Sequence, residues 1–296
     1  MSNINQDDLS SFPIGVFDSG MGGLTVLSAL MDRLPHENML YLGDTARLPY
    51  GTKSPGTVSR YALQAAAKLV ERKVKMLVIA CNTATASALD DLRKAWPDLP
   101  IFGVVGPGAQ AACTTTRNGS IAVIATESTI RGGAYQRAIK EINPDAAVTG
   151  HACSLFVPLT EEGWMDGPIV EAVARRYLGA LFDCDGAALE PMDDGQHGGN
   201  RKCLVPDCLV LGCTHFPPLA PTIRKVLGNE VAIVDSAATT AGAVENELAR
   251  LGLLNSQSGP GEAHFMTTDD EARFARIGSL FLGRELSPRQ VELVNL

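Results

Sequence analysis

Long apolar runs are missing from this 296-residue sequence, and no stretch reaches the length that a helix needs to cross a bilayer. The opening residues, MSNINQDDLSSF, also lack the basic start and the apolar run of a secretory signal peptide. Both absences argue against a membrane protein and against a secreted one. We therefore expect a soluble protein of the cytoplasm, with no membrane partner.

Clusters of basic residues are also missing. The formal net charge is −8, and Lys and Arg form no run of the kind that binds nucleic-acid phosphates. Nucleic acid is therefore not expected as the main partner. The seven cysteines are odd in number and scattered, which is untypical of a disulfide framework and fits a reducing compartment.

The sequence does contain a repeated alternation of short apolar runs, small turn residues and helical patterns. IGVFDSG leads into LTVLSALMDRL, and KMLVIAC leads into TASALDDLRKAW. Apolar strands that end in turn residues and alternate with helices predict an α/β fold with mainly parallel sheets. Ser54 before Pro55, and Ser287 at the start of SPRQVEL, are residue types that cap the beginning of a helix.

The second half of the chain resembles the first half in the same order. IAVIATESTIRGG resembles IGVFDSGMGG, LVLGCTHFPPL resembles LVIACNTATASAL, and VAIVDSAATTAGAV resembles IFGVVGPGAQAA. This order predicts two similar, pseudo-symmetric α/β domains from an internal duplication. Between the paired segments, residues 183–202 are rich in Gly and Asp and are expected to form a surface insertion.

Two cysteines occupy matching places in this duplication. Cys81 ends the apolar run LVIAC, and Cys213 ends LVLGC. Ligands of parallel α/β sheets bind at the carboxyl ends of the strands, so both thiols are expected at such a site. Two thiols that face each other across a cleft between domains suit one task well. One thiolate takes a proton from one face of a carbon atom, and the other thiol returns a proton to the opposite face, which inverts the stereocentre.

A zinc site is a competing interpretation, because Cys203, Cys208, Cys213 and His215 are close in sequence. However, the chain has no CxxC pair of the kind typical of zinc ligands. Cys208 and Cys213 also lie an odd number of residues apart in a strand pattern, so their side chains point to opposite faces. We expect no metal site.

Two further chemistries fit the residues less well. GVFDSGMGGL departs from the dinucleotide fingerprint, which requires Gly where Thr25 stands, and Asp18 in the same turn would repel a pyrophosphate. A cysteine hydrolase needs a single nucleophile beside a base, whereas this chain offers two matched thiols.

Four motifs, VFDSGMGGLTVL, YLGDTARLPYG, ACNTATA and LGCTHFPPL, resemble those of the glutamate racemases, which are amino-acid racemases of the aspartate/glutamate racemase superfamily. The resemblance runs from about Ile14 to the C-terminal HFMTTDDEARFARIGSLFLG and leaves out the N-terminal tail and residues 183–202. It implies two interlocked domains, with the chain returning to the first. We place the first domain at residues 1–103 and 240–296 and the second at 104–239. The resemblance also implies an active site in the interdomain cleft, no cofactor, homodimers, and interconversion of L- and D-glutamate that supplies D-glutamate for peptidoglycan.

The resemblance further implies roles for individual residues. Cys81 would act on D-glutamate with help from Asp18, and Cys213 would act on L-glutamate with help from His215. A third helper lies in LFVPLTEEGW, where Glu161 aligns best and Glu162 competes with it. The implied substrate-binding residues are Asp18, Ser19, Pro49, Tyr50, Gly51, Asn82, Thr83 and Thr214. Without the resemblance, the two threonines would be interpreted as helix caps.

Other functions remain open at this point. Within the same class, the protein could racemise aspartate or a related acid, although DSGMGG is more similar to the glutamate branch. From other classes, the alternatives are a thiol-dependent amidohydrolase and a two-domain binding protein without catalytic activity.

Overall fold

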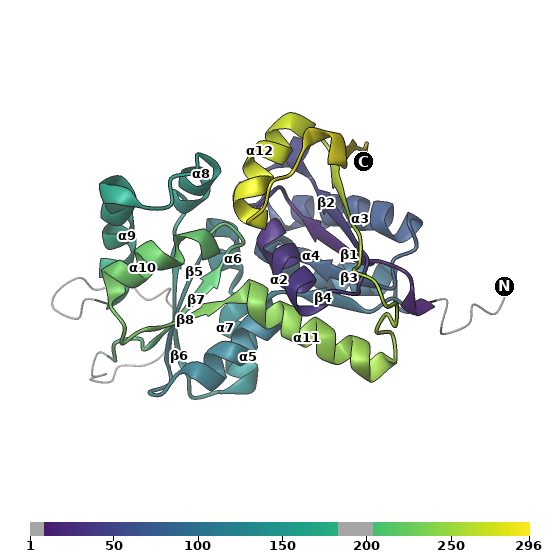
Figure 1. Ribbon diagram of the computed structural model, residues 1–296. Helices are drawn as coiled ribbons and strands as arrows, with labels where there is room; N and C mark the ends of the chain where they lie inside the picture. The colour runs from purple at the N-terminus through teal and green to yellow at the C-terminus, as the bar shows by residue number, and fades with distance from the viewer. Residues whose placement is uncertain (1–8, 183–203) are drawn as a thin grey trace.

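The computed structural model describes residues 9–182 and 204–296, so the predicted insertion at 183–202 lies outside the described residues. The strands form two sheets, with the order β10-β9-β2-β1-β3-β4 in the first and β6-β5-β7-β8 in the second. Figure 1 shows the two sheets in separate lobes, with α8 and α12 facing each other across the space between the lobes. The described residues contain no helix that is both long enough and apolar enough to cross a membrane.

The strands are short, and most of them lie in the predicted apolar runs, whereas β6, β9 and β10 do not. Their bounds are β1 (Ile14–Asp18), β2 (Met39–Gly43), β3 (Met76–Ile79), β4 (Ile101–Gly103), β5 (Ser120–Ala125), β6 (Ala147–Ala152), β7 (Cys208–Gly212), β8 (Ala232–Asp235), β9 (Ala263–Thr267) and β10 (Val291–Leu293). Every pair of neighbouring strands runs parallel. The order β2-β1-β3-β4 in the first sheet matches β6-β5-β7-β8 in the second. The predicted pseudo-symmetric α/β fold with parallel sheets is therefore confirmed.

Helices follow the strands as the sequence alternation predicts. The α-helices are α2 (Leu24–Arg33), α3 (Pro55–Glu71), α4 (Asn82–Ala95), α5 (Val105–Thr115), α6 (Glu127–Gly132), α7 (Ala134–Ile142), α8 (Phe156–Glu161), α9 (Gly167–Phe182), α10 (Ala220–Leu227), α11 (Ser236–Leu251) and α12 (Glu271–Leu282). Short 3-10 helices are η1 (Thr45–Arg47), η2 (Tyr50–Thr52), η3 (Pro217–Leu219) and η4 (Pro288–Gln290). The Ser54 side chain accepts a hydrogen bond from the Thr57 N–H, so it caps α3 as expected.

Each sheet is buried on both faces, which is the usual condition of parallel sheets. Along β1, Val16 packs into one apolar core and Phe17 into the core on the opposite face. In the second sheet, Cys208 lies in one core, whereas Cys213, beyond the strand end, lies in the other. The two cysteines thus lie on opposite sides of the sheet, as the period of two along a strand predicts.

The chain returns to the first sheet after β8. The buried face of α11, including Ala241, Val244 and Leu248, packs with Leu24 and Leu27 of α2 in a core of the first sheet. β9 and β10 then add to the edge of that sheet beside β2. The predicted boundary at 239/240 falls within α11, and the exact domain limits stay a prediction.

The segment after Ser287 differs from its sequence interpretation. Ser287 caps a single 3-10 turn, η4, rather than a longer helix, and the chain continues as β10. The reason is pairing. Val291 and Leu293 lie in register with Phe265 and Thr267 of β9, so extending the sheet replaces the hydrogen bonds that a longer helix would make.

Candidate active site

The two thiols lie at equivalent strand ends of the two sheets. Cys81 follows β3 and is the N-cap residue of α4, while Cys213 follows β7 directly. β3 and β7 hold matching places in their sheets, each beside the central strand β1 or β5. Both thiols are buried, and they are close enough for their charges to interact. The structure therefore brings the two predicted thiols together.

The surroundings of Cys81 are apolar apart from a few groups. Its sulfur lies 3.4 Å from Ser19 Oγ and accepts a hydrogen bond of 3.4 Å from the Ala84 N–H. Burial, together with the nearby charge of Asp18, raises the pKa of the Cys81 thiol to about 12. In this environment Cys81 holds its proton at neutral pH.

Asp18 is fully buried at the end of β1. Its Oδ2 accepts a 2.9 Å hydrogen bond from the Gly20 N–H, and its Oδ1 has no hydrogen-bond partner among the described residues. Burial raises the pKa of this carboxyl group above its ordinary value, although the positive charge of His215 opposes the shift. Asp18 thus has one oxygen atom available to exchange a proton.

Cys213 has a different set of neighbours. Its sulfur lies 4.0 Å from Nδ1 of His215, and His215 Nε2 lies 3.2 Å from Oε1 of Glu161. Arg273 Nη2, from α12 of the other lobe, lies 3.2 Å from the second oxygen of Glu161. Cys213, His215, Glu161 and Arg273 therefore form a continuous chain that crosses from one lobe to the other.

The His215 ring is held in its cationic form. Burial disfavours the charge, but hydrogen bonds to Cys213 and Glu161 and the negative charges of Cys213 and Asp18 outweigh it and raise the pKa of His215 to about 10. The pKa of Glu161 is lowered: burial opposes the shift, and the hydrogen bond to His215 and the charges of His215 and Arg273 outweigh it. Glu162, the competing helper, is exposed, and the structure brings Glu161 rather than Glu162 to the ring.

Two glycines let the lobes approach each other closely at this site. A Cβ atom on Gly22 would lie 2.4 Å from Nδ1 of His215, and one on Gly51 would lie 2.7 Å from Cβ of Thr126. Neither position has room for a side chain. The glycine-rich turn that follows β1 therefore makes a close contact with the CTH turn.

Threonine hydroxyls join the lobes beside the first thiol. Thr83 Oγ1 lies 3.0 Å from Thr126 Oγ1 and 3.2 Å from Thr129 Oγ1. Sequence reasoning missed Thr126 and Thr129. The duplication contained a signal for the first of them, because Thr126 follows IAVIA just as Ser19 follows IGVFD.

The remaining predicted residues are placed as follows. Tyr50 is buried, and its hydroxyl donates to Asp44. Pro49, which follows a cis peptide bond, is exposed. Asn82 and Thr214 are buried directly after Cys81 and Cys213, and Thr25 Oγ1 donates to the Thr214 carbonyl at 3.3 Å.

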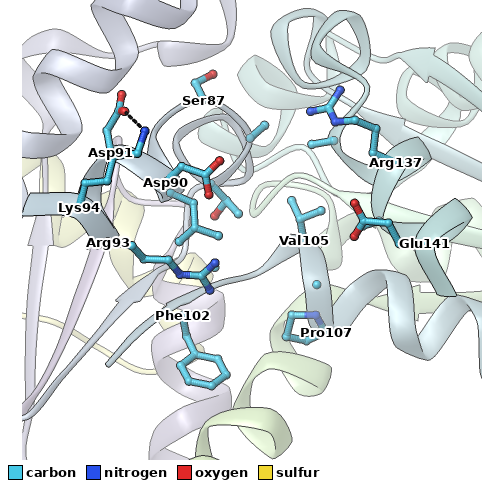
Figure 2. Close-up of a pocket in the computed structure, with 17 residues that line it drawn as sticks. Ser87, Asp90, Asp91, Arg93, Lys94, Phe102, Val105, Pro107, Arg137 and Glu141 are labelled. Atoms are coloured by element: carbon cyan, nitrogen blue, oxygen red, sulfur yellow. Dashed lines mark ion pairs between the residues drawn. The ribbon is translucent and has the colours of Figure 1, made fainter. Parts of the chain in front are cut away.

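A separate cavity of about 600 Å³ lies between α4, α5 and α7 (Figure 2). Its lining includes charges of both signs, among them the ion pair of Lys94 and Asp91, 3.8 Å apart. None of the predicted site residues lines it, so the cavity is distinct from the thiol site. Across the described ranges, no group of three or more His, Cys, Asp or Glu side chains is arranged to hold a metal ion.

Comparison with known proteins agrees with this arrangement. Residues 25–183 match the family model described as Asp/Glu/Hydantoin racemase. The chain is 48% identical over 273 residues to the glutamate racemase of Geobacter metallireducens, covering 92% of this chain and 93% of that protein. The crystal structure of Francisella tularensis glutamate racemase in complex with D-glutamate superposes with a TM-score of 0.83 at 36% identity, covering 97% of this chain and 98% of that one.

A second solved structure, glutamate racemase from Thermus thermophilus in complex with beta-chloro-D-alanine, gives a TM-score of 0.80 at 41% identity, with 97% of this chain and 98% of that one covered. The fold and the matched family model define an amino-acid racemase. The chain belongs to the Asp/Glu racemase family and, within it, to the glutamate racemases. The resemblance found in the sequence motifs is thereby confirmed.

Proposed function

We propose that this protein interconverts L-glutamate and D-glutamate, with Cys81 and Cys213 as the two bases. One observation carries the proposal above the others: two buried thiols lie at equivalent strand ends of two different sheets, near enough for their charges to interact. A substrate Cα bound between them would have one thiol on each face. Each thiol can accept or donate one proton, and racemisation requires only that one proton is removed from Cα and one is returned to it.

In the direction from L- to D-glutamate, the Cys213 thiolate takes the Cα proton. The C–H electron pair remains on the substrate as a carbanion, and the Cys81 thiol donates its proton to the opposite face. This direction starts from the protonation states described above, because His215 is cationic and Cys81 is a neutral thiol. In the reverse direction Cys81 must first lose a proton, and the free oxygen of Asp18 is the acceptor that we assign to it.

The substrate would be held by neutral donors. Ser19, Asn82, Thr83 and Thr214 provide hydroxyl and amide groups around the thiols, together with the backbone of Tyr50 and Gly51. Positioning in a site shielded from water reduces the barrier to proton transfer, because the reacting atoms are held in place and the charges are poorly screened. The proposal assigns neither a cofactor nor a metal to the reaction.

The wider setting follows from the family. We propose a homodimer in the cytoplasm that supplies D-glutamate for peptidoglycan. Light scattering coupled to size-exclusion chromatography tests the dimer, and a mass equal to that of one chain would contradict it.

The proposed reaction is tested by incubating the pure protein with L-glutamate alone and following the circular dichroism of the amino acid. We expect the signal to decay to zero without any added cofactor. Release of ammonia from an amide substrate would instead identify a hydrolase. Decay with L-aspartate but not with L-glutamate would identify an aspartate racemase, and no reaction with any of these compounds would leave only a binding protein.

A further inference from the structure

Tyr135, on α7 of the second lobe, contacts both thiol-bearing turns. It is fully buried, and its hydroxyl donates a 2.8 Å hydrogen bond to Oδ1 of Asn82, the residue that follows Cys81. The edge of its ring packs against Gly212, the residue before Cys213. A Cβ atom on Gly212 would lie 3.0 Å from Tyr135 Cε2, so the ring occupies the space that a side chain there would need. One side chain thus touches the first turn with its hydroxyl and the second with its ring.

The contact with Asn82 fixes which way the amide of that side chain points. With Oδ1 occupied by the Tyr135 hydroxyl, the NH2 group faces away from Tyr135. This Nδ2 atom is buried and has no hydrogen-bond partner among the described residues. A buried amide donor without a partner is unfavourable, so such groups usually have a function or bind a ligand.

A carboxylate of the substrate is the partner that this donor lacks. If the Asn82 amide turned over, its carbonyl oxygen would face an anionic substrate, and the two oxygens would repel each other. The phenol is a reliable donor for this purpose, because burial raises the pKa of Tyr135 well above its ordinary value.

We propose that Tyr135 is a positioning residue that holds the Asn82 amide with its NH2 toward the substrate carboxylate and ties this amide to the turn that carries the second thiol. This inference rests on the proposed function, since it assumes glutamate as the ligand. Tyr135 itself touches neither the thiols nor the reacting carbon in this account. It acts through Asn82.

The first test is Tyr135→Phe, which keeps the ring against Gly212 and removes only the hydroxyl. We expect KM for both enantiomers to rise about tenfold, equivalent to about 1.4 kcal/mol, with kcat changed less than about twofold. Tyr177→Phe is the matched control, because that hydroxyl accepts a hydrogen bond from the Leu155 N–H in another part of the second lobe. A control with the same rise in KM would show a general effect of losing a phenol and would overturn the proposal.

The second test is a double-mutant cycle with Asn82→Ala, measured as D-glutamate affinity by calorimetry. If Tyr135 acts through Asn82, removing its hydroxyl in the Asn82→Ala protein should change the affinity less than twofold. A further loss of about tenfold in that background would mean that Tyr135 acts by another route, and the proposal would fail.

Asn82→Asp keeps the inference testable even if Tyr135→Phe does not fold. The aspartate retains an oxygen for the Tyr135 hydroxyl but replaces the NH2 group with a second oxygen. We expect D-glutamate affinity to fall at least tenfold, and unchanged affinity would contradict the proposed orientation. If the unmodified protein does not racemise glutamate at all, the proposed function fails first. If it does, and Tyr135→Phe has the original KM, only the present inference fails.

Discussion

The two thiol turns are built on the same plan but differ in the residues that support them. The residue before each thiol has a different neighbour on the central strand. Ala80, which precedes Cys81, lies beside Asp18 of β1, one residue beyond the Phe17–Ile79 pair. Gly212, which precedes Cys213, is paired with Ala125 of β5. The first half therefore has a buried carboxyl group beside its thiol where the second half has a methyl group. On the other side of the thiols it is the second half that has the ionisable group. His215 stands two residues after Cys213, whereas the neutral Thr83 stands two residues after Cys81.

This difference gives two equivalent thiols different electrostatic surroundings. Burial and the charge of Asp18 raise the pKa of Cys81 to about 12, so that thiol stays protonated at neutral pH. Near Cys213 the charged neighbour is instead a cation, the His215 imidazolium, which Glu161 holds in place.

The largest effect is expected when one of the two thiols is removed. Cys81→Ser or Cys213→Ser should each lower kcat for racemisation by about a thousandfold or more, because positioned acid–base groups contribute about 10²–10⁴-fold and serine is a far weaker acid. Circular dichroism of the amino acid measures the rate, and that of the backbone measures the fold. Cys113→Ser, a half-buried cysteine outside the site, is the control. Near-normal activity in either active-site mutant would rule out two bases.

The next largest effect is expected when the residue proposed to assist each thiol, Asp18 or His215, is replaced. Asp18→Asn and His215→Asn should each lower kcat/KM by about a hundredfold, within the range for acid–base groups. The equilibrium constant is one, so kcat/KM must fall equally in both directions, and any asymmetry can appear only in individual steps. We expect the isotope effect of Cα-deuterated D-glutamate to change more in Asp18→Asn and that of L-glutamate to change more in His215→Asn. Equal changes from both sides in both mutants would contradict one helper for each thiol.

The cationic His215 should make the free energy of unfolding depend on pH. Its pKa of about 10 in the folded protein lies above the ordinary value of 6.5. The folded state therefore holds a proton that the unfolded chain loses, and this contribution is complete below pH 6.5 and is lost as the pH rises to about 10.

Urea unfolding of the native protein and of His215→Asn between pH 6 and pH 10 measures this contribution. The difference in free energy of unfolding should shrink with rising pH, with a limiting slope of about 1.4 kcal/mol per pH unit. A difference that stays constant across this range would show that the ring is neutral in the folded protein.

The smallest effect is expected at the outer end of the chain of contacts. Arg273 pairs with Glu161, but its side chain is about half exposed, at 47%, and ion pairs of this kind contribute about 0–1 kcal/mol. Arg273→Gln should lower kcat/KM less than about fivefold, with a difference that disappears in high salt. Arg276→Gln, exposed on the same helix, is the control. A loss comparable to that of His215→Asn would mean that the two lobes are coupled through Arg273 far more strongly than the geometry indicates.

Local chemistry made much of this structure predictable from the sequence. Apolar runs that end in small residues gave strands such as β3 and β7, because a parallel strand is buried on both faces and must be apolar throughout. The duplication, visible as paired motifs in one order, placed Cys81 and Cys213 at equivalent strand ends. The helix cap at Ser54 was also predictable, because it is a local contact: the Ser54 side chain and the Thr57 N–H are three residues apart in the sequence.

Contacts between distant residues were decided by the tertiary structure. Glu161, the last residue of α8, reaches His215, 54 residues away, whereas the next residue, Glu162, points to solvent. Tyr135 meets Asn82 across 53 residues, and Arg273 meets Glu161 across 112. The segment after Ser287 became a strand because an open sheet edge was beside it. Turn and periodicity preferences act over a few residues, whereas these contacts depend on how two sheets pack, and no short stretch of sequence contains that information.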